Sequence, residues 1–311
     1  MAVPTRIVEV GRRCGDDAAR MGAVARAISR IATTGNGRGA TLLASGDVWG
    51  LLMRVARVVQ DDGAKEAVAT AIGAIVGGRR VMLSVYEEAR DVLVKLGRAA
   101  RNDGVRRATA AAIRDIVDSV GGYDEALRVT STEQVRDLLV GIGQGGGSDG
   151  VREAVAGAFR SLAGRNEGQR LLATVAVRDV LVAVGRTWSC DGVREGVAGA
   201  IRNVAGCDEG RRMMATAAVR DVLLEMWRVG GNEVLRRVRA ARRLATHPKV
   251  DRTTCRADAH LSWTALWAPP SKQSGGEPAG KSACSGFFTG GTCAAATCCW
   301  ACCCACQACW C

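Results

Sequence analysis

The residues best suited to chemistry in this 311-residue chain are cysteines, and ten of the fourteen lie at or after Cys284. Two pairs, Cys299 with Cys302 and Cys306 with Cys309, have the CxxC spacing of zinc ligands. Clustered cysteines also suit palmitoylation, which attaches a protein to a membrane surface. Because CxxC spacings arise by chance in so dense a run, we expect no metal site. We interpret residues 246–311 as a disordered, low-complexity tail.

Groups for catalysis are scarce in the rest of the chain. The two histidines, His247 and His260, both lie in the tail, so a histidine-centred triad or a histidine-rich metal site is not available before it. The glycine-rich run GIGQGGGSDG at 141–150 lacks the lysine of a phosphate-binding loop, and we interpret it as a turn between helices. We therefore expect a protein that is not an enzyme and that uses no cofactor.

The elements before the tail repeat one pattern. The residues VREAVAGAFRSLAGRNEGQR from Val151 reappear from Val193 as VREGVAGAIRNVAGCDEGRR. Two series of related segments recur every 41 to 46 residues, the first beginning at Ala89, Val135, Val177 and Val219, and the second at Asp62, Asp103, Asp149 and Asp191. A period of this length sustained over most of a chain predicts a solenoid of stacked units.

Each unit has the pattern of three helices. Apolar residues share one helix face in the segment from Asp191: Val193, Val197, Ala200, Ile201 and Val204. We expect Asp191 to cap this helix and Gly206 to end it in the left-handed conformation. The segment from Val219 predicts a shorter helix, with a still shorter one before it. A unit is then a short helix, a second helix, a turn containing Asp-Gly and a longer third helix.

This pattern resembles the armadillo repeat, whose third helix ends in a phrase like AIRNVAG at 200–206 and AFRSLAG at 158–164. The similarity covers about residues 16–245 and leaves residues 1–15 as an N-terminal leader. It implies an all-α, armadillo-type α-solenoid, a right-handed superhelix of about five to six three-helix repeats. Armadillo proteins hold extended or helical segments of partner proteins in a concave groove lined by their third helices.

The nuclear import receptors of this family carry a Trp in each third helix and, four residues later, an Asn that binds the partner's backbone. The Trp positions correspond here to Arg26, Thr70, Ala111, Gly157 and Gly199. The Asn positions correspond to Arg30, Ala74, Asp115, Ser161 and Asn203. Only Asn203 matches, so the resemblance does not extend to import-receptor function.

The same spacing identifies this protein's own candidate groove, because residues four apart share a helix face. The candidate partner-binding residues, together with Ala74 and Ala111, are Glu66, Thr70, Arg107, Asp115, Glu153, Gly157, Ser161, Glu195, Gly199 and Asn203. This face is small and polar in every unit. The alternative is that these are ordinary solvated positions.

Arginine recurs at two further positions of the repeat. One row begins the second helices and is followed each time by Asp: Arg90, Arg136, Arg178 and Arg220. Another row begins the third helices: Arg106, Arg152 and Arg194. One interpretation is that these arginines pair locally with the neighbouring acidic residues and keep the protein soluble. Alternatively, with a net charge of +12, they form basic ribbons for an acidic partner or a nucleic-acid backbone.

Together these features predict a noncatalytic protein–protein interaction scaffold that binds a partner segment along the third-helix face. The alternatives are a binder of nucleic acid or acidic surfaces, and a membrane-tethered adaptor with a palmitoylated cysteine tail. Charged residues interrupt every apolar run before the tail, so we expect no transmembrane segment and a cytoplasmic or nuclear location. Nothing in the sequence names the partner.

Overall fold

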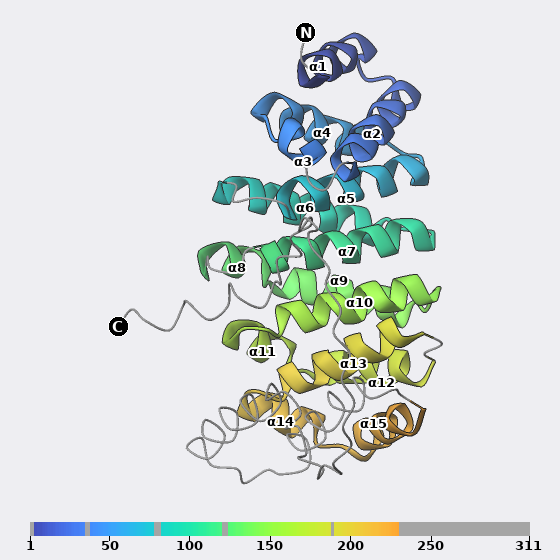
Figure 1. Cartoon of the computed structure of the whole chain (residues 1–311), viewed down its shortest axis with the longest axis vertical. Helices are drawn as coiled ribbons and strands as arrows, with labels where there is room; N and C mark the ends of the chain where they lie inside the picture. Colours follow the sequence, from blue (N-terminus) through green and yellow to red (C-terminus); the bar gives the residue numbers. More distant parts are fainter. Residues whose placement is uncertain (1–2, 35–37, 78–81, 120–123, 188–189, 230–311) are drawn as a thin grey trace, which may run out of the picture. The chain divides into compact units, whose positions relative to one another are not determined.

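The computed structural model describes residues 3–34, 38–77, 82–119, 124–187 and 190–229, and within these ranges every regular element is an α-helix (Figure 1). The helices are α1 (Val3–Cys14), α2 (Ala18–Thr33), α3 (Arg38–Leu43), α4 (Gly46–Val58), α5 (Asp62–Gly77), α6 (Leu83–Arg98), α7 (Asp103–Ser119), α8 (Asp124–Thr130), α9 (Glu133–Gln144), α10 (Asp149–Leu162), α11 (Asn166–Leu172), α12 (Val175–Arg186), α13 (Asp191–Val204), α14 (Asp208–Met214) and α15 (Ala217–Val229).

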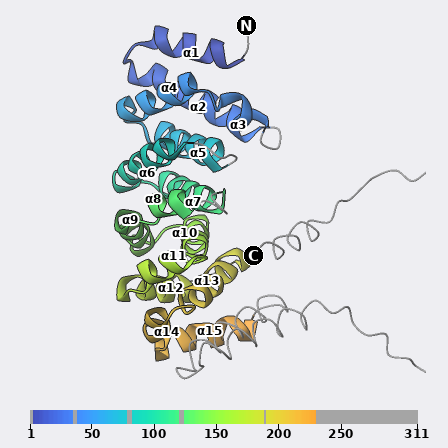
Figure 2. The same cartoon turned by 90° about the vertical axis from the view of Figure 1, so that its left-hand side faces the viewer.

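Two layers of helices run through the described part of the chain. The third helices α2, α5, α7, α10 and α13 pack one against the next (Figure 2). The second helices α6, α9, α12 and α15 likewise pack one against the next and form the other layer. Between the layers lies one continuous core of Ala, Val, Leu and Ile side chains. The predicted all-α solenoid is therefore confirmed, with five third helices in the described residues.

Small residues let neighbouring third helices approach closely. A Cβ atom on Gly73 of α5 would lie 2.9 Å from the Ala112 Cα of α7, and one on Gly196 of α13 would lie 2.9 Å from the Ala156 Cβ of α10. Distances below about 3 Å between such carbon atoms are repulsive, so these positions require glycine if the spacing is to be kept. The alanine-rich composition of the repeat thus sets the distance between units.

In the unit that contains α6, the second helix begins earlier in the repeat than in the two units that follow. In the two following units, Thr132 and Thr174 are the N-caps of α9 and α12, and each Oγ1 accepts a hydrogen bond from the backbone amide three residues on, at 3.4 Å. Tyr86 occupies the equivalent position, where its side chain is buried. Without a Thr cap, α6 continues unbroken across the point where the other second helices begin.

Both ends of α13 differ from the sequence-based expectation. Its N-cap is Cys190, while Asp191 is the first helical residue and forms an ion pair with Arg194. Gly206 does not take the left-handed conformation. Ala205 is the C-cap of the helix, and its amide donates to the Ile201 carbonyl at 3.0 Å. The chain turns directly into α14 from there. The two predictions for Asp191 and Gly206 were therefore wrong.

The glycine-rich run at 141–150 does form the predicted turn. Gly146 and Gly147 link α9 to α10 with φ values of 68° and 127°, a region that residues with a Cβ rarely occupy. At the N-terminal end, most of the predicted leader is α1, which packs against α2 and α4. The predicted domain boundary at Ala245 and the tail at 246–311 lie outside the described residues.

One glycine of the short helix is fixed by its contact with the preceding third helix. Gly168 of α11 is buried, and a Cβ there would lie 1.8 Å from the Leu162 carbonyl oxygen at the end of α10. Gly210 of α14 stands in the same relation to Val204, also at 1.8 Å. This contact explains why the glycine recurs in NEGQR and DEGRR.

We therefore expect Gly168→Ala to lower the free energy of unfolding by about 2 kcal/mol or more, because the added methyl group meets backbone that cannot rotate away. Gly141→Ala is the matched control, since nothing lies within 4 Å of its Cβ position. In a helix this control should raise stability by roughly 0.5–1 kcal/mol. Urea denaturation of both variants measures the difference, and equal effects would show that the close contact at Gly168 is not a constraint.

Candidate functional site: the third-helix face

A hollow of about 380 Å³ lies on the face formed by the third helices, and residues of α2, α5, α7 and α10 line it. We call the surface at the register of Glu66, Thr70 and Ala74 in successive third helices the third-helix face. The floor of the hollow is small and apolar: Gly73, Ala74, Ala108, Ala111, Ala112 and Ala154. Its polar lining includes Thr70, Arg107, Arg114, Asp115 and Glu153. Four of the predicted partner-binding residues therefore meet at one depression.

Long side chains of one third helix lie over glycines that begin the next. A Cβ on Gly150 of α10 would lie 3.1 Å from Arg107 Cδ, and a Cβ on Gly192 of α13 would lie 2.6 Å from Glu153 Oε1. Arg107 also donates from Nη2 to Glu66 Oε1 across the α5–α7 boundary, at 3.2 Å. Gly150 and Gly192, each in an Asp-Gly pair, thus make room for a charged side chain from the neighbouring unit.

Gly157 and Gly199 are buried on this face rather than available to a partner. A Cβ on Gly157 would lie 3.2 Å from Arg114 Cδ, and one on Gly199 would lie 2.6 Å from Arg160 Cδ. The two arginine side chains cover the two glycines of the following helix. Sequence reasoning placed both glycines at the binding surface because periodicity does not show which side chain crosses to the next unit.

A third row of arginines was missed by the sequence analysis. Arg114, Arg160 and Arg202 each precede the position of the family's Asn, and each guanidinium donates to a neighbouring oxygen. Arg114 binds Asp115 Oδ1 with Nε and Nη2, at 3.0 and 2.9 Å. Arg160 Nη1 donates to Glu195 Oε1 at 3.1 Å, so Glu195 takes part in an ion pair between units. The repetition of Arg before that position is the signal that could have found this row.

Asn203, the one match to the import receptors, uses its amide within its own chain. Its Nδ2 donates to the Arg160 carbonyl of α10 at 2.9 Å, and its Oδ1 accepts from Arg202 Nη2 at 3.2 Å. A carbonyl needs a donor and a guanidinium needs an acceptor, so both contacts fix the same orientation of the amide. The side chain that binds a partner's backbone in the import receptors here joins two neighbouring units.

The remaining predicted residues differ in their burial and in the hydrogen bonds and ion pairs that they form. Thr70 Oγ1 donates to the Glu66 carbonyl at 2.9 Å, and Ser161 is half-buried beyond the hollow. Glu153 is exposed and forms no hydrogen bond or ion pair with any described residue. Glu153 is therefore the carboxylate at the hollow whose charge is not balanced by a neighbour within the described ranges.

The arginine row at the start of the second helices is paired locally. The guanidiniums of Arg90, Arg136, Arg178 and Arg220 each contact the Asp that follows, at 2.7 to 3.2 Å. The first three side chains are only 19 to 24% exposed, whereas that of Arg220 is 52% exposed. Arg90 Nη1 also donates to the Val129 carbonyl at 3.0 Å. This geometry agrees with the local-pairing interpretation and balances the charge of the row.

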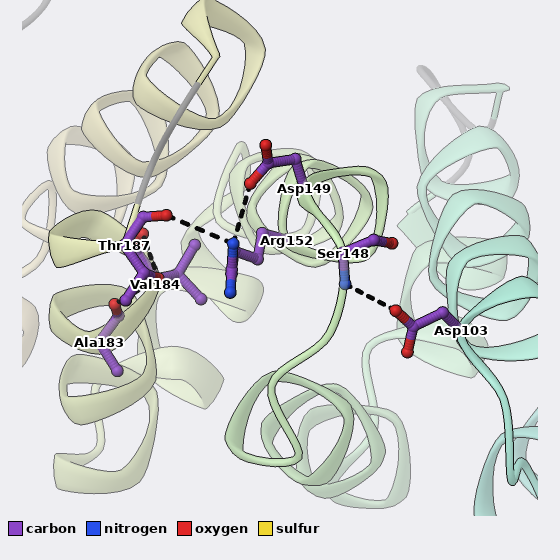
Figure 3. Close-up of polar contacts among 7 residues, drawn as sticks. All are labelled: Asp103, Ser148, Asp149, Arg152, Ala183, Val184 and Thr187. Atoms are coloured by element: carbon purple, nitrogen blue, oxygen red, sulfur yellow. Dashed lines mark hydrogen bonds and ion pairs between the residues drawn. The ribbon is translucent and has the colours of Figure 1, made fainter.

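The row at the start of the third helices joins helix ends, as Figure 3 shows around α10. Arg152 Nη1 donates to Asp149 Oδ1 at 2.9 Å and to the Thr187 carbonyl beyond the end of α12 at 3.3 Å. On the other side, the Ser148 amide donates to Asp103 Oδ2 of α7 at 2.6 Å. The start of α10 is therefore tied to the unit before it through Ser148 and to the unit after it through Arg152.

Metal and membrane features are limited within the described ranges. No group of three or more His, Cys, Asp or Glu side chains there is arranged to hold a metal ion, and Cys14, Cys190 and Cys207 are free thiols. No helix in the same ranges combines the length and apolar character needed to cross a bilayer. The two histidines and the clustered cysteines lie outside these ranges.

Comparison with known proteins identifies the fold. No protein-family model and no curated protein matches the chain. Among solved structures, a designed armadillo repeat protein in complex with the peptide (KR)4 is 20% identical, with a TM-score of 0.64 over 78% of this chain and 99% of that one. Computationally designed armadillo repeat proteins for modular peptide recognition match at 19% identity and a TM-score of 0.64, with the same coverage. The chain has an armadillo-type repeat fold.

The role of Asn203 in this armadillo-type stack can be tested by mutation. We expect Asn203→Ala to lower the free energy of unfolding by about 1 kcal/mol relative to Ser161→Ala, because only Asn203 makes a side-chain hydrogen bond to the preceding unit. Ser161 occupies the equivalent position of α10, so the comparison cancels the gain in helix propensity. If urea denaturation gave equal values for the two variants, the bond would not join the units.

Proposed function

We propose that this protein is a noncatalytic interaction scaffold that binds a segment of a partner protein along the third-helix face. The observation that carries the proposal is the hollow, because it lies on this face and is lined by four successive third helices. A depression that crosses several units suits an elongated ligand such as a peptide. Beyond the hollow, Arg160 of α10 and Glu195 of α13 form an ion pair across this face.

The peptide binding of the similar armadillo structures supports this proposal. One was solved with a (KR)4 peptide, and the others were designed for modular peptide recognition. Those proteins share about a fifth of their residues with this chain, so the likeness concerns the backbone that presents a groove. The chemistry of the groove has to come from this chain's own side chains.

Glu153 is the residue we propose as the main polar contact for the partner. Its carboxylate is exposed at the hollow and is not neutralised by a neighbouring described side chain. A backbone N–H or a basic side chain of the partner can donate to it in a charge-assisted hydrogen bond. Glu66 and Glu195, by contrast, already accept from Arg107 and Arg160.

The nucleic-acid alternative receives less support from the second-helix arginines. Each of Arg90, Arg136, Arg178 and Arg220 contacts its own Asp, and a phosphate would have to compete with that carboxylate. Membrane attachment through the tail concerns residues outside the described ranges. We therefore favour a protein segment as the partner, in the cytoplasm or nucleus.

The test begins with short random peptides selected on the immobilised full-length chain. For a selected peptide, we expect Glu153→Lys to raise the Kd about tenfold or more, because it replaces an acceptor by a cation. Glu87→Lys is the matched control: Glu87 is exposed on α6 of the second-helix layer and makes no hydrogen bond or ion pair with a described residue. Titration calorimetry measures both variants.

Three results separate the proposals. A large effect of Glu153→Lys with no effect of Glu87→Lys supports peptide binding at the third-helix face. Equal effects would show that only net charge matters and would contradict the proposal. If a labelled single-stranded RNA binds instead, Glu153→Lys should strengthen that binding, whereas replacing Arg136, Arg178 and Arg220 by Ala should weaken it and lower its salt dependence by roughly one unit of slope per lost phosphate contact.

A further inference from the structure

The hollow on the third-helix face has a lining that favours one class of side chain over others. Its volume of about 380 Å³ falls within the range of small ligand pockets, and none of its lining residues is aromatic. At the position where the import receptors resembled by this chain carry Trp, α7 has Ala111. Ala111 therefore leaves this point of the face without a bulky side chain of its own.

Charges of both signs border the hollow, so a charged side chain that enters it deeply meets at least one group of like charge. Arg107 and Arg114 bring two guanidiniums, and Asp115 and Glu153 bring two carboxylates. A lysine or arginine inserted deeply would approach the guanidiniums, and an acidic side chain would approach the carboxylates. A neutral, bulky side chain avoids both costs and removes its own apolar surface from water over the alanine floor.

The guanidiniums of Arg107 and Arg114 can also stack on an aromatic ring. Arg107 and Arg114 are seven residues apart on α7, two helical turns with a rise of about 10 Å, with Ala108, Ala111 and Ala112 between them. Both use guanidinium N–H groups to contact carboxylates, Glu66 and Asp115, at 2.9 to 3.2 Å. The face of a guanidinium remains suited to stacking on an aromatic ring, whose negative face attracts the cation.

We propose that this hollow is a receptor for an aromatic side chain of the partner peptide, with Trp as the best fit and Tyr or Phe as alternatives. The proposal rests on the proposed function, since it names the anchor of the same bound segment. The ring lies over Ala111 between the two guanidiniums, and the peptide backbone beside it donates to Glu153. The usual arrangement of the import receptors is thereby inverted, because the aromatic group comes from the ligand.

Peptides selected on the full-length chain, and dependent on Glu153 as above, provide the test. We expect them to share one aromatic residue, and we expect its replacement by Ala to raise the Kd about tenfold or more, as for other anchor residues. Replacement of the same residue by Leu keeps apolar area but loses the ring contacts, so its loss of affinity should be smaller than that of Ala.

Variants of the protein locate the anchor. Ala111→Leu fills the hollow and should raise the Kd of the aromatic peptide about tenfold or more, while Ala183→Leu, on the exposed surface of α12 in the second-helix layer, should change it less than about twofold. Ala111 is half-buried at the hollow, and Ala183 is exposed on α12. Ala74→Leu fills the hollow from α5 and replaces Ala111→Leu if circular dichroism shows that the latter is misfolded.

The outcomes separate this inference from the proposed function. Glu153-dependent peptides that lack a common aromatic residue, or that bind Ala111→Leu and Ala74→Leu as well as the unchanged protein, would overturn the aromatic receptor and leave peptide binding in place. A selection that yields no Glu153-dependent peptide would overturn both. An aromatic-dependent peptide that is weakened by the filled hollow but not by Ala183→Leu establishes the proposal.

Discussion

Each third helix packs against the next through residues with little or no side chain, and this close approach governs the rest of the structure. Gly73 against Ala112 and Gly196 against Ala156 leave no space for a methyl group at these contacts. Larger side chains at these positions would separate the units and expose the core between the two layers. The same closeness brings side chains of one unit within hydrogen-bond distance of the next, as with Arg160 and Glu195.

The character of the third-helix face follows from that spacing. Long side chains of one third helix lie over glycines of the next. Arg107 and Arg114 cover Gly150 and Gly157, and Glu153 and Arg160 cover Gly192 and Gly199. Where α7 presents alanines instead, the face is hollowed. The hollow that we propose as the binding surface therefore lies where small residues of α5 and α7 are left uncovered.

The sequence was sufficient to predict the repeat, the three-helix unit and the face on which the hollow lies, because apolar periodicity and a regular period are local properties. It could not show that Asn203 bonds to Arg160 or that Arg114 covers Gly157, since these contacts depend on the distance between helices. The long α6 follows from a single substitution, Tyr86 at a position that is Thr132 or Thr174 in later units. Of the predicted site, Thr70, Arg107, Asp115 and Glu153 line the hollow, while their role in binding remains a proposal.

The most direct measurement for a stack of units that contact only their neighbours is the removal of one whole period. Deleting residues 151–192 joins Gly150 to Val193, so that the Asp-Gly turn is kept and Asp149 stands three residues before Arg194 as it does before Arg152. Circular dichroism and urea denaturation of this shortened chain should show unchanged helicity per residue and cooperative unfolding, with a lower free energy of unfolding. Loss of helical structure throughout the shortened chain would contradict the account and indicate a single closed domain.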